Sequence, residues 1–505
     1  MRTRPRAGRL SARAPVLLAA VLLAGGLAAG CSSGSSGGGG SDVIKAVLPP
    51  NTGSITASDN AGLKKLTSEY EAAHKGVTVQ WLTNTATQID SANATMESQA
   101  SGGSAPDLVW EQYGPVTSGA LPKGLLQNIK PYLEKPNPYV SGNTSWLSLF
   151  SKSTIPYMTS PNGDIDVILG SSVETGMFYS KAAFARAGIT TMPATWADFI
   201  TDLGKLKAAG ITPTMFADGA LCNPSWFERL ATSSLLAGQV SQFNVNHAQV
   251  TNGLDVAIGI HKGIISMHNP RYAEVWKLLG QLVRYSGSGQ SGYDACATPN
   301  GTTPPLSTQS LLAQGKVGLL WGGSWYIPQL ASAGFSTSKF GVFPEPPITT
   351  ASTPLATGTS TVGVIGGPNG NGQWGVTSQQ ADHTMTPAKT KTVMNFLAWL
   401  FTPQHLGYWI RINQSGADIP TETAAPTLNL PGLKSLLPTG KVATVVDVVL
   451  DDVLSTAATN SGLRLVQQYV NGSMPYPAFA SAWQSLLTSS ANSWATANHV
   501  DLSKY

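Results

Sequence analysis

Short β-rich runs alternate with amphipathic helical runs in the first third of the sequence. Residues 43–49 (VIKAVLP), 77–83 (VTVQWLT) and 106–110 (PDLVW) have the apolar and β-branched composition of strands, and residues 62–74 and 89–101 between them have a helical pattern. This β-α-β-α-β order predicts a parallel or mixed sheet covered by helices. With 505 residues, the chain is too long for one ordinary core, so we expect two lobes.

Further elements follow the same logic. Asn162-Gly163 predicts the turn of a hairpin over residues 156–170, and Thr195 and Gly210 are placed to cap the start and the end of one helix. Residues 370–375 (GNGQWG) fit the glycine pattern of a dinucleotide-binding loop, but no helix opens directly after them, so we interpret them as a flexible loop. More helices are predicted at 180–189, 272–285, 388–401, 462–470 and 477–494.

The N-terminus has the layout of an export signal. Arginines in residues 1–13 precede an apolar stretch that ends in small residues before Cys31. The sequence LAAGC resembles a bacterial lipobox, although Ala28 stands where Leu is most frequent. We therefore expect a lipoprotein signal peptide over residues 1–30, a lipid-bearing Cys31, and a Ser/Gly tether over residues 31–41. An ordinary signal peptide with an incidental cysteine is the alternative. The first interpretation predicts an extracytoplasmic protein that is lipid-anchored to the cell membrane.

Charge excludes one class of partner. Only 11% of residues are charged, and much of the formal net charge of +4 comes from the first segment. The rest of the chain is close to neutral and has no basic stripe, so we expect no nucleic-acid partner.

Two cysteines remain after Cys31. In an oxidising compartment, Cys222 and Cys296 predict one disulfide, and two buried free thiols are the alternative. A metal site is not expected.

Motifs of catalysis are missing. The seven histidines form no HExxH pair, and no GxSxG sequence occurs. Asp164 with Asp166, and Asp451 with Asp452, are close in sequence, but adjacent carboxylates are typical of a solvated turn or helix face. No catalytic residue and no cofactor are predicted.

Two tryptophans end an apolar run at residues 315–326 (GKVGLLWGGSWY). The Gly-Gly pair between them predicts a buried strand that leaves its sheet in a tight turn. Trp321 and Trp325 then either pack in the core or form a flat platform at a strand end, where open α/β sheets bind ligands.

Several stretches, in order, resemble one family. They are EYEAAHKGVTVQ, APDLVW with GLLQNIKPYL, GMFYSKAAFARAGI, TWADFITDLGKLKAAGITP, GKVGLLWGGSW, NFLAWLFTPQHLGYW and SGADIP. The ordered set is similar to the extracellular solute-binding proteins of bacterial ABC importers, in the carbohydrate family that includes maltose-binding proteins. Lys75 replaces the usual proline and Ser180 the usual asparagine. The resemblance covers about residues 42–480.

The resemblance implies a fold. We expect an α/β protein of the two-lobe, type II periplasmic-binding-protein class, with mixed sheets flanked by helices and hinge strands between the lobes. The expected N-terminal lobe comprises residues 42–165 and 362–415, and the expected C-terminal lobe comprises residues 166–361 and 416–505.

The resemblance also implies a ligand site. Trp325 falls where the family presents an aromatic ring to the ligand, and Trp321 is assigned to packing at the strand end. The residues at the end of the third predicted strand, the segment LCNPSWFERL, which matches a ligand-contacting segment of the family, and a tryptophan near a predicted crossover supply further candidates. Packing in a strand, a solvated loop carboxylate and a turn are the alternative roles. These candidates are Trp110, Glu111, Gln112, Tyr113, Asn223, Trp226 and Trp374.

Such residue types suit a sugar. The apolar face of a pyranose can lie on an indole ring, while carboxylate and amide groups pair with its hydroxyls. The resemblance therefore implies a monomeric, non-enzymatic binding protein that delivers a mono- or oligosaccharide to the transmembrane subunits of an ABC permease. A binding protein for another small solute, such as a peptide or polyol, is the first alternative. A secreted glycan hydrolase is the second.

Overall fold

The strands and helices below come from a computed structural model of the chain. It describes residues 42–49, 60–84, 98–110, 124–152, 154–159, 163–214, 225–245, 247, 250–285, 311–324, 326–327, 330, 335–336, 338–357, 362–364, 366–367, 372–412, 418–426, 432–436, 442–450, 453–470 and 472–505.

The first sheet begins as the sequence predicts. β1 (Asp42–Val47) pairs in parallel with β2 (Val77–Leu82), and α1 (Asn60–Ala73) lies between them in the chain. β3 (Leu108–Trp110) pairs in parallel with the other side of β1. The predicted β-α-β start of a helix-covered sheet is therefore confirmed.

Two later strands complete this sheet in the opposite direction. β11 (Gln373–Val376) lies between β3 and β4 (Val167–Leu169) and is antiparallel to both, which gives the order β2-β1-β3-β11-β4. The prediction of a flexible loop at residues 370–375 is therefore wrong for its second half. Gly375 fits the centre of the sheet because a Cβ atom there would lie only 3.0 Å from the Leu126 side chain.

The hairpin predicted over residues 156–170 is replaced in part by a helix. Residues Ile155–Met158 form α5, where the first strand was expected. An antiparallel bridge joins Thr159 to Ile165, and Gly163 has the positive φ of +84° that a turn requires. Asn162, the other predicted turn residue, lies outside the described residues.

Helices cover the first sheet and bury a continuous apolar core, which we call the first core. It contains residues from the N-terminal third, such as Ile44 and Leu66, and from the helices after β11, such as Phe396 and Trp409. The covering elements besides α1 are α4 (Lys130–Leu133), η3 (Trp146–Leu149), α5, α15 (Pro387–Leu400) and α16 (Pro403–Ile412).

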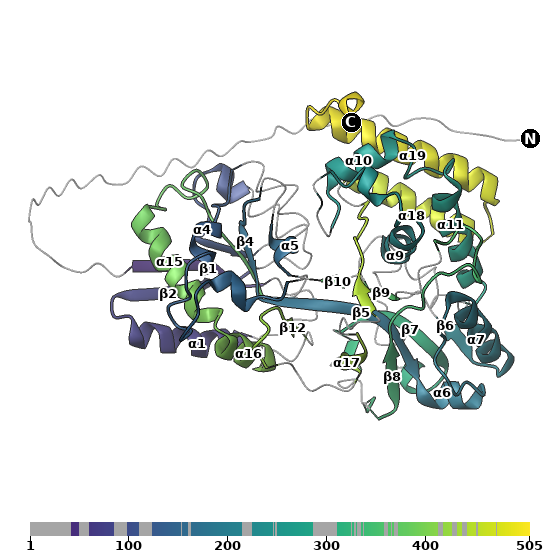
Figure 1. Ribbon diagram of the computed structural model, residues 1–505, viewed down its shortest axis with the longest axis horizontal. Helices are drawn as coiled ribbons and strands as arrows, with labels where there is room; N and C mark the ends of the chain where they lie inside the picture. Colours follow the sequence, from purple (N-terminus) through teal and green to yellow (C-terminus); the bar gives the residue numbers. More distant parts are fainter. Residues whose placement is uncertain are drawn as a thin grey trace, which may run out of the picture. The chain divides into compact units, whose positions relative to one another are not determined.

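The second sheet is built around β5 (Ser171–Ser180), the longest strand. β7 (Val317–Gly323) and β8 (Phe340–Phe343) pair with it in antiparallel fashion, and β6 (Thr212–Thr214) pairs in parallel with β7. β10 (Gly366–Gly367) and β12 (Ile419–Pro420) pair with the N-terminal half of β5. Figure 1 shows β5 running from the first group of elements to the second.

Both faces of the second sheet are buried, which explains why β7 is apolar throughout. Met177 belongs to a large cluster that also contains Trp276 and Trp483, whereas the next residue, Phe178, belongs to a smaller cluster with Tyr326. We call these two clusters together the second core. Trp321 lies in the large cluster with 5% exposure, in agreement with its predicted packing role.

Helix α7 illustrates how local sequence sets the ends of an element. It spans Trp196–Ala208, and Thr195 forms a capping box with Asp198 at its start. Gly210 follows the C-terminal end with a φ of +70°. Both predicted signals are confirmed.

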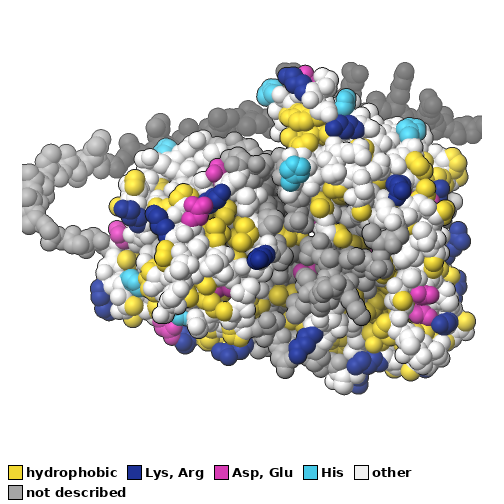
Figure 2. All heavy atoms as spheres, in the orientation of Figure 1, with side chains coloured by type: hydrophobic (Ala, Val, Ile, Leu, Met, Phe, Trp, Pro, Cys, Tyr) yellow, Lys and Arg dark blue, Asp and Glu magenta, His cyan; other side chains and the backbone are white. Residues whose placement is uncertain are grey.

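The remaining elements surround the second core. They are α6 (Lys181–Arg186), α9 (Ser225–Leu235), η4 (Val240–Gln242), α10 (Gly253–His261), α11 (Pro270–Val283), α17 (Leu433–Leu436), α18 (Thr456–Val470), α19 (Tyr476–Ala497), η5 (Leu502–Lys504) and the parallel pair of β9 (Val362–Val364) with β13 (Val442–Thr444). Among the described helices, none combines the length and apolar character needed to cross a bilayer. On the face shown in Figure 2, Lys and Arg side chains stand scattered among uncharged ones.

Candidate functional site

The chain passes between the two sheets at Gly170. Its N–H donates to the carbonyl of Gly372 over 2.6 Å, and its own carbonyl accepts from the N–H of Thr421 over 3.1 Å. The hydroxyl of Ser171 accepts from the N–H of Gly372 over 3.0 Å. Three segments that are far apart in sequence thus meet where β4 ends and β5 begins.

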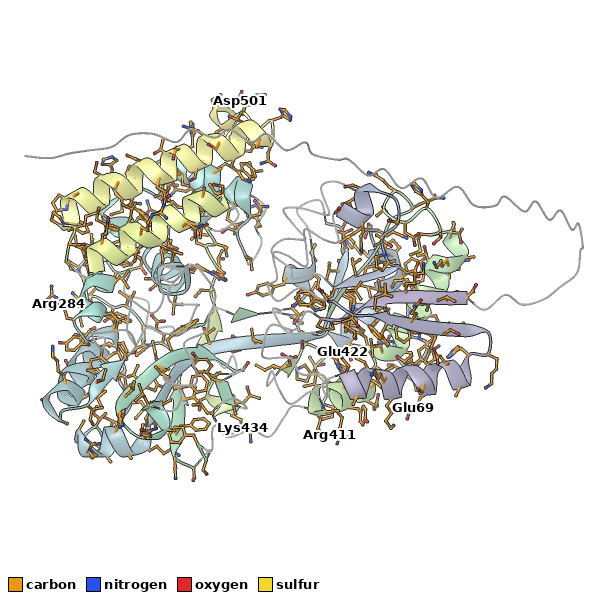
Figure 3. The ribbon with its side chains drawn as sticks, turned by 180° about the vertical axis from the view of Figure 1, so that it is seen from behind. Glu69, Arg284, Arg411, Glu422, Lys434 and Asp501 are labelled. Atoms are coloured by element: carbon orange, nitrogen blue, oxygen red, sulfur yellow. The ribbon has the colours of Figure 1, made fainter. Side chains whose placement is uncertain are left out.

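A buried acid lies directly after Thr421, on the segment that follows β12. Glu422, labelled in Figure 3, pairs through its backbone with Phe150 of the first core and is only 2% exposed. Burial raises the pKa of its carboxyl well above the usual range, and the indole of Trp146 opposes that rise. Glu422 therefore packs against the first core and holds the segment after β12 there.

Two predicted site residues lie at the ends of first-sheet strands. Trp110 is opposite Trp374 in the pairing of β3 with β11, and the two side chains are 5% and 0% exposed. The Trp374 indole N–H donates to the carbonyl of Val47 over 3.0 Å, and its ring packs near those of Trp81 and Trp409. Trp374 thus has a packing role in the first core.

The other predicted site residues have no described side chain. Glu111, Gln112 and Tyr113 come directly after β3, and Asn223 and Trp325 also lie outside the described residues. So do Cys31 and the cysteine pair Cys222 and Cys296, and the disulfide stays a prediction. Trp226 falls in the first turn of α9, whose backbone alone is described there.

A polar pair that the sequence analysis did not single out lies at the end of the second sheet. The register that places Thr175 opposite Gly323 brings Glu174 opposite Ser324, and the Ser324 N–H donates to the Glu174 carbonyl over 2.8 Å. Directly opposite residues of an antiparallel pair project from the same face, with Cβ atoms about 5 Å apart. On the other side of Glu174 lies Gly366, which has no side chain.

Both members of this pair are buried and have polar atoms without a partner. Glu174 is 5% exposed and Ser324 is 0% exposed. Within the part of the chain that the structure describes, neither Oε2 of Glu174 nor Oγ of Ser324 has a hydrogen-bond partner. Burial raises the pKa of the Glu174 carboxyl to about 8. Unpaired buried polar groups cost free energy, so this strand end is suited to an incoming ligand that supplies hydrogen bonds.

A sequence signal for Glu174 exists. It is an acid inside a strand that is otherwise buried and uncharged, SSVETGMFYS. Charged residues are almost never fully buried without a reason, so such a position marks a functional candidate. Glu174 becomes a stronger candidate because the strand register places it opposite Ser324, the residue before Trp325.

Helix α9, which begins just after Asn223 and carries Trp226, is held by a buried ion pair. Arg229 donates from Nε to Oδ1 of Asp447 over 2.8 Å and from Nη2 to Oδ2, and the two residues are 7% and 3% exposed. The carbonyl of Asp447 also accepts from the N–H of Thr251 over 2.9 Å. This bidentate pair orients α9 relative to the segment that follows β13.

No group of three or more His, Cys, Asp or Glu within the described ranges is arranged to hold a metal ion. Glu174 and Ser324 offer a carboxyl and a hydroxyl that can exchange hydrogen bonds with a polar solute.

Solved structures share this fold. A chitin oligosaccharide binding protein superposes with a TM-score of 0.62 at 20% identity, covering 89% of this chain and 100% of that chain. A probable secreted solute-binding lipoprotein from Streptomyces coelicolor gives 0.64 at 15% identity, covering 88% and 98%. The solute-binding protein RafE in complex with raffinose gives 0.58 at 16% identity, covering 89% and 99%. These likenesses confirm the two-lobe, type II solute-binding fold.

Sequence comparison identifies the family. No curated protein matches the chain. The family described as bacterial extracellular solute-binding protein, however, matches residues 65–430, which is well over half of the sequence. The members and the structural neighbours are binding proteins. This chain belongs to the bacterial extracellular solute-binding protein family.

Proposed function

We propose that this protein captures a carbohydrate, either a mono- or an oligosaccharide, and delivers it to the membrane permease of an ABC importer. The observation that carries the proposal is the buried pair of Glu174 and Ser324 at the edge of the second sheet, directly before Trp325 in the chain. A carboxyl, a hydroxyl and an indole are the groups that a sugar needs: acceptors and donors for its hydroxyls and a flat apolar surface for its ring.

The names of the structural neighbours support this choice of solute. One is described as binding chitin oligosaccharide and another is in complex with raffinose. Glu174 extends the site predicted from the sequence, in which Trp110, Glu111, Gln112, Tyr113, Asn223, Trp226 and Trp325 are the proposed contacts. Because Trp374 is fully buried in the first core, we do not include it among them.

Calorimetric titration tests the proposal. The full-length protein is titrated with a panel that includes raffinose and triacetylchitotriose, and each sugar is recovered afterwards and checked for intact bonds. We expect saturable binding without turnover. Absence of binding to every member of a broad sugar panel would contradict the carbohydrate assignment, and hydrolysis of any member would contradict a pure binding function.

Substitution of Trp325 tests the aromatic platform. Trp325→Ala removes the ring on which the apolar face of the sugar is proposed to lie, and we expect the affinity to fall by about tenfold or more. Trp325→Phe keeps a smaller ring and should retain most of the affinity. Equal loss in both variants would point to a structural role for Trp325, and no loss in either would remove it from the site.

We also propose that Cys31 anchors the protein to the outer face of the cell membrane. Fractionation of cells that produce the protein tests this step. The unchanged chain should sediment with membranes, and Cys31→Ser should appear in the soluble extracytoplasmic fraction, since the lipid would have no attachment point. Membrane association that persists in the variant would contradict lipidation at Cys31.

A further inference from the structure

The surroundings of Glu174 determine which protonation state of its carboxyl is more stable. A buried carboxyl without a partner is more stable as the neutral acid, because its charge has nothing to pair with. A ligand that donates hydrogen bonds to the same oxygens favours the carboxylate instead. The protonation state that suits the empty site is therefore the opposite of the one that suits the occupied site.

Charged groups from the packed elements do not change this balance. Glu345 follows β8, Asp418 precedes β12, Lys434 lies exposed on α17, and Tyr326 follows β7 by three residues. Burial raises the pKa of the Glu174 carboxyl, and no charged group among the described residues adds to that effect. A ligand that enters the site can therefore change the protonation state of this carboxyl.

We propose that capture of the solute is coupled to the release of one proton from Glu174, with the Ser324 hydroxyl donating to the carboxylate that forms. This inference rests on the proposed carbohydrate function and specifies how its site works. The proton leaves to the buffer, and hydrogen bonds from the solute's hydroxyls and from Ser324 take its place. Bonds to a charged acceptor are about twice as strong as neutral ones, which supplies the driving force for ionisation.

The coupling has a quantitative signature. With a pKa of about 8 in the free protein, and a bound value well below 7, about 0.9 proton is released per ligand at pH 7. Affinity then rises with pH, by roughly tenfold between pH 6 and pH 7, and levels off above pH 8. A solute is held more tightly in neutral and alkaline medium than in acidic medium.

Titration calorimetry in two buffers measures the released proton. The full-length protein is titrated with raffinose and with triacetylchitotriose at pH 7, in phosphate and in Tris, whose ionisation enthalpies differ widely. The difference in observed heat gives the number of protons released. A series from pH 6 to pH 8.5 gives the slope of affinity against pH.

Three variants test whether Glu174 is the group that releases the proton. Glu174→Gln should abolish the release and flatten the pH dependence. Glu345→Gln is the matched control, because burial also raises the pKa of Glu345 to about 8 while its side chain lies after a different strand. This control should release the proton as the unchanged protein does. Ser324→Ala should weaken binding by roughly five- to tenfold at pH 7, because the carboxylate of the occupied site loses its hydroxyl donor.

The outcomes separate the two proposals. Binding of a sugar with no proton release, or release that survives Glu174→Gln, overturns the coupling while the carbohydrate function stands. Loss of release in Glu345→Gln together with its retention in Glu174→Gln assigns the proton elsewhere and also overturns it. If no member of the panel binds, the carbohydrate function fails first, and the coupling falls with it.

Discussion

At the scale of single residues, burial of polar groups marks the site more clearly than residue type does. The sequence contains 13 tryptophans and 27 acidic residues, so composition alone selects none of them. Glu174 and Ser324 stand out because both are buried, both hold an oxygen without a hydrogen-bond partner among the described residues, and they face each other at the end of the β5–β7 pairing. The free energy cost of such groups is recovered only when a ligand binds.

The raised pKa of Glu174 predicts an effect on stability. In the unfolded chain the carboxyl ionises near pH 4.5, whereas in the folded protein it stays protonated up to about pH 8. Between these values the unfolded state binds fewer protons, so stability falls as pH rises. Glu174→Gln removes this loss. The free energy of unfolding of the variant relative to the unchanged protein should rise between pH 4 and pH 7 by on the order of 3 kcal/mol.

Denaturant unfolding at the two pH values measures this difference without any ligand. A comparison across pH within one variant cancels the constant cost or gain of the amide group itself. A relative stability that does not change between pH 4 and pH 7 would mean that Glu174 is ionised in the folded protein.

At the scale of elements, one ion pair connects α9 to a segment more than two hundred residues away. Arg229 and Asp447 are separated by 218 positions, and both are buried. The segment around Asp447 also bonds to Thr251, which precedes the capping residue of α10. The position of α9, and with it the start of the helix that carries Trp226, depends on this contact.

Removal of one partner should therefore be costly. Asp447→Ala removes the carboxylate that accepts both hydrogen bonds from the buried Arg229 guanidinium, and we expect a loss of about 3–5 kcal/mol in the free energy of unfolding. The exposed pair of Lys65 and Glu69 is the control, since Lys65→Ala should change stability by less than about 1 kcal/mol. The double variant Arg229→Met with Asp447→Leu should recover much of the loss. Equal effects of Asp447→Ala and Lys65→Ala in denaturant unfolding would contradict a buried, coupled pair.

At the scale of the whole molecule, the chain crosses between the two sheets at a point with no spare room. β4 belongs to the first sheet, so the crossing follows Leu169, slightly later than the boundary expected at residue 165. A Cβ atom on Gly170 would lie 2.6 Å from the Phe401 ring and 3.0 Å from the Leu406 side chain. Both of these side chains are fully or almost fully buried.

Gly170→Ala should destabilise the protein for this reason. Overpacking of a buried site costs about 1–3 kcal/mol, and the measurement is the denaturant midpoint at constant slope. Gly238→Ala is a matched control because nothing lies within 4 Å of its added methyl group. A neutral Gly170→Ala would show that the crossing can widen to admit a methyl group, which the packing of Phe401 and Leu406 argues against.

Part of this structure could be predicted from the sequence because it depends on local forces. The β-α-β start of the first sheet, the capping of α7 by Thr195 and the apolar strand β7 follow from side-chain pattern and from backbone preferences of neighbouring residues. The family resemblance added the two-lobe fold, which the comparisons confirm. It also indicated which strand ends to consider.

The remaining features depend on tertiary structure alone, because no local sequence pattern shows which distant segments of the chain pair with each other. Residues 373–376 follow the glycine-containing stretch GNG and look like part of a loop until β3 and β4 supply hydrogen bonds on both sides and make them an inner strand of the sheet. Trp374 looks like a ligand platform until Val47, Trp81 and Trp409 enclose it. Glu174 and Ser324 are 150 positions apart by number, and only the register of β5 with β7 brings them together as neighbours.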